Sequence, residues 1–132
     1  MKTLILSLIF ASAGYAAEFA LSAVVVKDGD TITADVHIGL DNLVFHDQTI
    51  RFNDIDCWET SKHRQSVVVT DDEVAKGKKA RAELEGMVKS AKAITGATGA
   101  TQRDVYGRRL FSVKIDGESV AEIMRAKGHE RK

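Results

Sequence analysis

The 132-residue chain has no proline, one cysteine and few aromatic residues (6%), and its formal net charge is zero. Without proline, a proline-rich linker or ligand segment is excluded. The single cysteine, Cys57, excludes an intrachain disulfide and a zinc site with four cysteine ligands, and the four histidines lack the spacing of metal ligands. The balanced charge excludes a basic protein that coats nucleic acid. The length and the mixing of charged with apolar residues predict one folded domain.

The N-terminus carries a pattern that must be separated from the fold. Lys2 supplies a positive charge, residues 4–13 form an apolar run, and small residues follow at positions 14–17. This order predicts a secretory signal peptide over residues 1–17, and hence a secreted or periplasmic mature domain over residues 18–132. The run is too short for a stable membrane span, so no membrane association is expected after its removal. An N-terminal core helix or a retained anchor is the alternative interpretation.

The two halves of the predicted mature chain carry opposite charge. Residues 18–75 contain 12 acidic and four basic residues, whereas residues 76–132 contain seven acidic and 14 basic residues. Such halves either pair with each other in the fold, or bind a cation on one side and an anion on the other. The two outcomes are compatible.

Apolar periodicity and turn residues predict strands and helices along the mature chain. Alternation predicts strands over residues 19–26, 31–38, 43–55 and 109–115, and the third of these is broken at residues 46–48. A further strand, followed by a loop, is predicted over residues 93–100. Residues 60–71 read as a loop. Capping boxes at residues 70–73 and 119–122 predict a helix over about 71–92 and a short helix that Gly128 ends.

The predicted order is three strands, a long helix, two strands and a short helix. This order predicts a mainly β fold with helices, a five-stranded barrel of the oligonucleotide/oligosaccharide-binding (OB) type, with the long helix after strand 3 and the short helix after strand 5. Another α+β arrangement is the alternative, because the pattern alone does not prove strand order.

Three short motifs contain residues that could carry chemistry: DGDT at 28–31, RFNDIDCWET at 51–60 and DVYGR at 104–108. The first could bind a hard cation through its carboxylates, or form an ordinary hairpin turn. The second brings an arginine and carboxylates to the end of a strand, where they could bind a metal, hold a phosphate and activate water, or form a surface ion pair. The third offers a phenol and a guanidinium before the last strand, or a turn with a solvated arginine.

In this order and spacing, the motifs resemble those of the staphylococcal nuclease (thermonuclease) family. The family pattern is D-G-D-T after the first strand, R-[LF]-x-x-I-D-x-P-E-T at the third strand and D-x-Y-G-R before the fifth strand. The segment from Asp116 to Gly128 is also similar to the next turn and helix of the family. The resemblance covers about residues 19–129, which is nearly all of the predicted mature chain.

The resemblance implies a calcium-dependent nuclease that cuts DNA and RNA and works as a monomer. It implies that Ca²⁺ is held by the carboxylates of Asp30 and Asp56 and by the backbone carbonyl of Cys57. It implies that Glu59 acts as the general base or positions the attacking water. The remaining implied roles are phosphate binding and transition-state stabilisation by Arg51 and Arg108, a hydrogen bond from Tyr106 to a neighbouring phosphate, and tuning of the site by Asp28, which does not itself bind the ion.

The chain departs from the family pattern at several positions. Trp58 stands where proline is usual, and it could stack on a base or cover the edge of the core. Val105 stands where some members have lysine, and Asp54 stands where glycine is frequent. Many members continue beyond the position of Lys132 with an aromatic-containing segment and another helix, which form one wall of the nucleotide pocket and cover part of the core. Stability, affinity and activity are therefore expected to be affected in this chain. A non-catalytic barrel that binds nucleic acid or another ligand, and a partner module of a periplasmic assembly, are the alternative functions.

Overall fold

The computed structural model describes residues 17–39, 42–61 and 69–131, and every structural statement below concerns these residues. Nearly all of the predicted signal peptide, and residues 62–68 of the predicted loop, lie outside them. Within the described part of the chain, no helix is long and apolar enough to cross a membrane.

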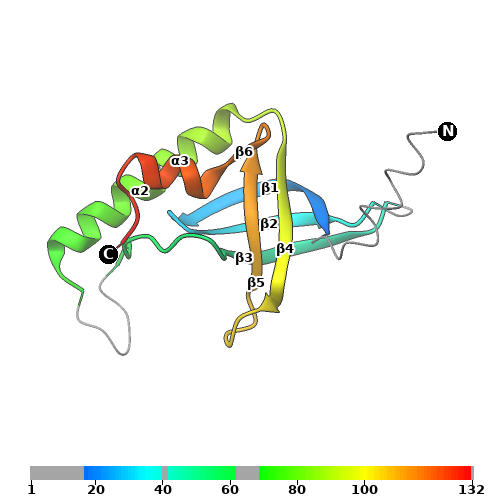
Figure 1. The fold of residues 1–132 in the computed structure, drawn as a ribbon, viewed down its shortest axis with the longest axis horizontal. Coiled ribbons are helices and arrows are strands. Elements are labelled where there is room, and N and C mark those ends of the chain that lie inside the picture. Colours follow the sequence, from blue (N-terminus) through cyan, green and yellow to red (C-terminus); the bar gives the residue numbers. More distant parts are fainter. Residues whose placement is uncertain (1–16, 40–41, 62–68, 132) are drawn as a thin grey trace.

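The fold is mainly β, with a closed five-stranded barrel and two helices, as the sequence predicts (Figure 1). In chain order the elements are β1 (Glu18–Asp28), β2 (Thr31–His37), β3 (Val44–Phe52), α2 (Asp71–Ser90), β4 (Ile94–Arg103), β5 (Arg109–Ile115), β6 (Glu118–Ser119) and α3 (Val120–Ala126). The strands lie in the order β3-β2-β1-β4-β5-β6, and a parallel contact between β3 and β5 closes the barrel. This architecture is OB-like.

The barrel core follows the alternation seen in the sequence. On β5, Phe111, Val113 and Ile115 are buried, while the residues between them are at least partly exposed. Ile32 on β2 and Ile50 on β3 are almost fully buried and lie opposite each other across the β2–β3 ladder. Removing these apolar side chains from water is the main stabilising contribution to the barrel.

Both helices begin at the predicted caps. The backbone N–H of Glu73 donates to the Thr70 hydroxyl at 3.2 Å, and that of Glu122 donates to the Ser119 hydroxyl at 3.2 Å. These bonds satisfy N–H groups that a helix end leaves without a partner. α3 ends before Gly128, whose φ of +82° is readily adopted only by glycine. α2 ends at Ser90, two residues before the predicted position.

Two strand predictions need correction. β3 is continuous over the predicted break at residues 46–48, because Asp47 adopts a φ of +52° and the β2–β3 register shifts there as a bulge. The Asp35 carboxylate stabilises the bulge by accepting a hydrogen bond from the Asp47 N–H at 2.9 Å. β3 then ends at Phe52 rather than at Ile55, and β4 continues to Arg103 where a loop is predicted.

Candidate active site

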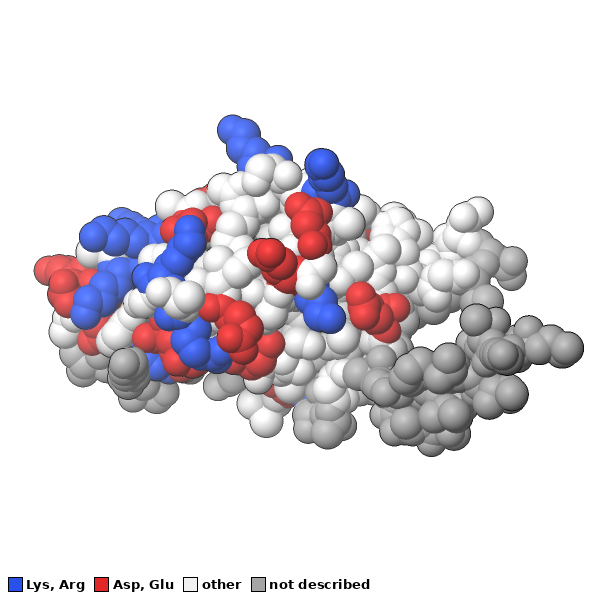
Figure 2. Space-filling view, turned by 45° about the horizontal axis from the view of Figure 1, so that its top comes forward, with Lys and Arg blue, Asp and Glu red and all other residues white. Residues whose placement is uncertain are grey.

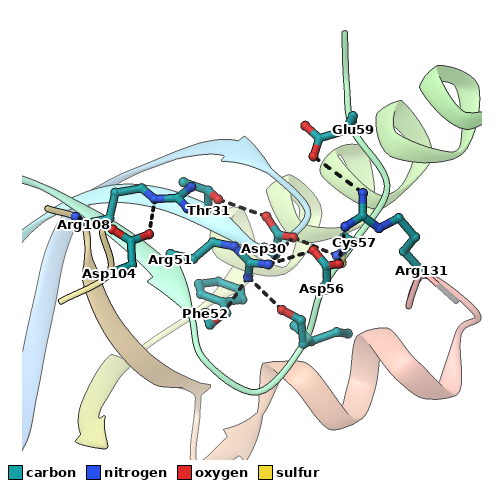
Figure 3. A network of polar contacts seen from close by, with 11 residues as sticks. Asp30, Thr31, Arg51, Phe52, Asp56, Cys57, Glu59, Asp104, Arg108 and Arg131 are labelled. Atoms are coloured by element: carbon teal, nitrogen blue, oxygen red, sulfur yellow. Dashed lines mark hydrogen bonds and ion pairs between the residues drawn. The ribbon is translucent and has the colours of Figure 1, made fainter. Parts of the chain in front are cut away.

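The first two sequence motifs meet at one end of the barrel. The DGDT motif forms the β1–β2 turn, and Thr31 pairs with Arg51 across the β2–β3 ladder. The Phe52 N–H donates to the Asp30 carbonyl at 2.8 Å, which holds the segment after β3 against this turn. Figure 3 shows the side chains of Asp30, Arg51, Asp56, Glu59 and Arg131 linked in one network, with the Arg108–Asp104 pair of the third motif drawn beside it as a separate pair.

Asp30 is the most enclosed carboxylate of this group, with only 6% of its surface exposed. Its Oδ1 accepts from the Thr31 hydroxyl at 2.9 Å, and its Oδ2 accepts from the Cys57 N–H at 2.7 Å. Burial raises the pKa of Asp30 above its ordinary value, although the Arg51 charge and these hydrogen bonds act in the opposite direction. The carboxylate is therefore fixed in place on one side of the network.

Arg51 joins the two predicted calcium-binding carboxylates. Its Nη2 lies 2.8 Å from Asp56 Oδ1 and 3.3 Å from Asp30 Oδ2. Its Nη1 donates to the backbone carbonyls of Phe52 at 2.6 Å and Ile55 at 2.7 Å. Most of the donors of this guanidinium are thus used within the protein, so a phosphate would be met mainly by the Nε–H.

Arg131 also belongs to the site, although none of the motifs includes it. Its Nη2 lies 2.5 Å from Asp56 Oδ2, its Nη1 lies 3.9 Å from Glu59 Oε1, and its N–H donates to the Asp56 carbonyl at 2.7 Å. An isolated antiparallel bridge between Cys57 and Glu130 aligns the two segments. Because 75 positions separate Arg131 from Asp56, no local sequence pattern could reveal the contact.

Glu59 is positioned by its backbone as much as by its side chain. A Cβ atom added to Gly77 of α2 would lie 2.0 Å from the Glu59 carbonyl oxygen and 2.8 Å from that of Trp58. The helix therefore packs directly against the backbone of this segment, which only glycine permits. On the other side, the Thr60 hydroxyl donates to Asp28 Oδ1 at 2.6 Å, so Asp28 anchors the residue that follows Glu59.

Arg108 is held by the residue that begins its motif. Its Nε–H donates to Asp104 Oδ2 at 2.6 Å, and its backbone N–H donates to Asp104 Oδ1 at 2.9 Å. Although burial raises the pKa of the Asp104 carboxyl, the hydrogen bonds and charge of Arg108, together with the hydrogen bond from the Tyr106 N–H, lower the pKa overall. Tyr106 is 81% exposed, and the Arg108 guanidinium lies 5.5 Å from the centre of its ring.

The strand pairing places Arg108 close to β3, the strand that carries Arg51. Arg51 pairs with Leu110 in the parallel β3–β5 contact. Arg108 lies two positions before Leu110 and immediately before β5, so its backbone lies beside β3. In agreement, Figure 3 shows the Arg108 side chain extending in the direction of Thr31.

Cys57 contributes its backbone rather than its sulfur. Its N–H donates to Asp30 Oδ2 at 2.7 Å, and its backbone forms the bridge with Glu130. The thiol is buried, and burial, reinforced by the Asp30 charge, raises its pKa to about 12. The thiol is therefore protonated at neutral pH, and we expect no disulfide between folded molecules.

The described residues of this site could supply only a few oxygen ligands to a Ca²⁺ ion. Among the described residues, no three His, Cys, Asp or Glu side chains converge as a metal site. The carboxylates of Asp30 and Asp56 nevertheless both contact one cationic nitrogen of Arg51, at 3.3 and 2.8 Å, so both are directed toward one position. Ca²⁺ prefers oxygen ligands and completes its coordination with carbonyls and water. Arg51 and Arg131 would compete with it for the same oxygens.

The chain matches no protein-family model and no curated protein. The resemblance to the thermonuclease family therefore stays a prediction.

Proposed function

We propose that the chain is a calcium-dependent nuclease that hydrolyses phosphodiester bonds of DNA and RNA. The observation that supports this most is the grouping of Asp30, Arg51, Asp56 and Glu59 in one network at one end of the barrel. Phosphodiester hydrolysis needs a positioned water, a proton acceptor and positive charge beside the phosphate, and these residue types can provide all three.

Each residue has a definite part in the proposed reaction. Asp30 and Asp56 would hold Ca²⁺, which when bound supplies positive charge beside the scissile phosphate. Glu59 accepts a proton from the attacking water. The Nε–H of Arg51 and the guanidinium of Arg108 donate hydrogen bonds to phosphate oxygens and stabilise the negative charge that grows on them. Exposed Tyr106 is placed to donate to a neighbouring phosphate of the same strand.

Removing the metal tests the proposal directly. We expect the purified chain to cleave labelled single-stranded DNA, double-stranded DNA and RNA when Ca²⁺ is present, and to lose this activity when a chelator is added. The measurement is product formation on a denaturing gel, with Ca²⁺ restored as the control. Cleavage that continues in the chelator, or no cleavage under any of these conditions, would contradict it.

A barrel that binds nucleic acid without cutting it is the second candidate function. It is favoured by the arginines that occupy the carboxylates, above all Arg131, which lies on both Asp56 and Glu59. Under this alternative the arginines replace the metal permanently, and the chain binds oligonucleotides equally well with Ca²⁺ and with chelator.

The Arg131 contact leads to a prediction that separates the two functions. Replacing Arg131 by alanine removes a competing cation from Asp56, so Ca²⁺ should bind more tightly by about two- to fivefold, as expected for a partly exposed ion pair. Arg131→Lys, which keeps the charge, is the control and should stay close to the unaltered chain. Isothermal titration with Ca²⁺ measures the effect. Equal or weaker binding by the alanine variant would show that Arg131 does not compete with the ion.

A further inference from the structure

A second feature next to the proposed active site has no part in the reaction described above. It is a cavity of about 640 Å³, here called the basic pocket, whose wall includes Trp58, Lys76, Lys79, Arg125, Lys127 and Glu130. Trp58 lies between Cys57 and Glu59 in the sequence, and Glu130 precedes Arg131. The pocket is therefore built partly from the two segments that also form the site.

The pocket wall is strongly biased toward positive charge. The wall contains four cationic side chains and one carboxylate, that of Glu130, which pairs with Arg125 at 3.1 Å. The acids that pair with Lys76 (Asp72, at 3.2 Å) and with Lys127 (Glu83, at 3.0 Å) are not part of the wall, and both lysine side chains are half exposed. Ion pairs this exposed contribute little and can exchange for another anion. Figure 2 shows basic side chains, with acidic ones between them, gathered over the end of the molecule that α2 and α3 form.

Lys79 and Trp58 give the pocket the composition of a nucleic-acid site. Lys79 is exposed on α2 and makes no ion pair with any described residue, so its charge is available to a ligand. The half-buried Trp58 presents its ring to Lys76 Nζ at 4.7 Å from the ring centre. Basic grooves that contain aromatic rings bind single-stranded nucleic acid, because the cations contact phosphates while the rings contact bases.

We propose that the basic pocket binds a phosphate of a nucleic-acid strand on one side of the bond to be cleaved. This inference rests on the proposed function, since the strand it describes is the substrate. The backbone N–H of Cys57 donates to the buried Asp30 carboxylate, whereas the next residue, Trp58, lines the pocket, so one short segment touches both sites. A strand that passes over Trp58 and Glu59 reaches both sites.

Two adjacent lysines of α2 provide a matched test. Lys79 lines the pocket, whereas Lys78 is equally exposed on the same helix but does not line it. In the full chain, Lys79→Glu should weaken binding of a fluorescent single-stranded 12-mer DNA by about tenfold at low salt and lower the salt dependence of binding by about one phosphate contact. Lys78→Glu should change the affinity by less than twofold. Fluorescence anisotropy in the presence of chelator measures binding without cleavage.

The outcomes separate this inference from the proposed nuclease activity. Equal weakening by the two variants, or no weakening by either, would overturn the pocket. The pocket proposal would also fail if the two variants differed in their affinity for inorganic phosphate but not in their affinity for the oligonucleotide. The pocket would then bind a free anion rather than a strand. If only Lys79→Glu weakens binding and the unaltered chain never cleaves DNA, the pocket stands and the nuclease proposal falls. If the chain does cleave, Lys79→Glu should raise KM and leave kcat nearly unchanged.

Discussion

Replacing Glu59 by glutamine is expected to slow calcium-dependent cleavage by about 10²- to 10⁴-fold, the usual contribution of a general base. Glutamine has the size and shape of glutamate but cannot accept a proton from water. Its amide can still lie beside Arg131, which is 3.9 Å from the glutamate in the unaltered chain. The Gly77 contact involves only the backbone of residue 59. Folding and Ca²⁺ binding should therefore change little, and the loss should appear in kcat.

The matched control for this experiment is Glu85→Gln. Glu85 lies on the exposed surface of α2 and forms a surface ion pair with Arg81 at 3.6 Å. This substitution removes the same charge away from the site and should leave the cleavage rate within about twofold, because exposed pairs contribute little. Single-turnover kinetics with Ca²⁺, together with thermal melting of both variants, measure the effect. If Glu59→Gln cleaves as fast as Glu85→Gln, Glu59 is not the base.

The elements that could be predicted from the sequence are those fixed by near neighbours. The caps at Thr70 and Ser119 need residues only three positions away, and the buried set of β5 needs only alternation. The bulge at Asp47 depends on Asp35 from the neighbouring strand. The sequence indicates an interruption at this point. It does not show that the interruption is a bulge within a continuous strand, because that form depends on the neighbouring strand.

The same distinction holds for the candidate site. The motifs predict that Asp30, Arg51 and Asp56 lie together. In the structure, both carboxylates contact one nitrogen of the Arg51 guanidinium. The sequence did not indicate that Arg51 also binds two backbone carbonyls, or that Arg131 lies against Asp56. Contacts of this kind depend on how distant segments meet after folding, and neither residue type nor spacing encodes them locally.

The opposite charges of the two halves are used within this network. Arg131, from the basic half, neutralises Asp56 and lies near Glu59, both from the acidic half. Arg51, although it lies in the acidic half, neutralises Asp30 and Asp56. Charge pairing inside the fold thus already occurs at the position where a cation is proposed to bind. Under the proposed function, Ca²⁺ would therefore exchange one positive charge for another rather than fill a purely negative site.

Two glycines of α2 are expected to respond to alanine with opposite signs. Gly77→Ala should lower the free energy of unfolding by about 2 kcal/mol or more, as for overpacking against atoms that cannot move aside. The added Cβ would lie 2.0 Å from the Glu59 carbonyl oxygen, so α2 or the segment carrying Glu59 must shift. At Gly86 nothing lies within 4 Å of an added Cβ, and Gly86→Ala should raise the free energy of unfolding by about 0.5–1 kcal/mol through helix propensity.

Comparing Gly77→Ala with Gly86→Ala also tests whether α2 positions the proposed base, Glu59. A displacement of Glu59 by about 1 Å is enough to reduce catalysis on the order of 100-fold, so Gly77→Ala should lose activity even at temperatures where it is fully folded. Gly86→Ala changes the same helix in the same way but leaves the Glu59 contact intact, and it should keep the activity of the unaltered chain. Urea unfolding gives the stability of each variant, and cleavage at low temperature gives its activity. A Gly77→Ala variant that is as stable and as active as Gly86→Ala would show that the helix does not pack against this segment.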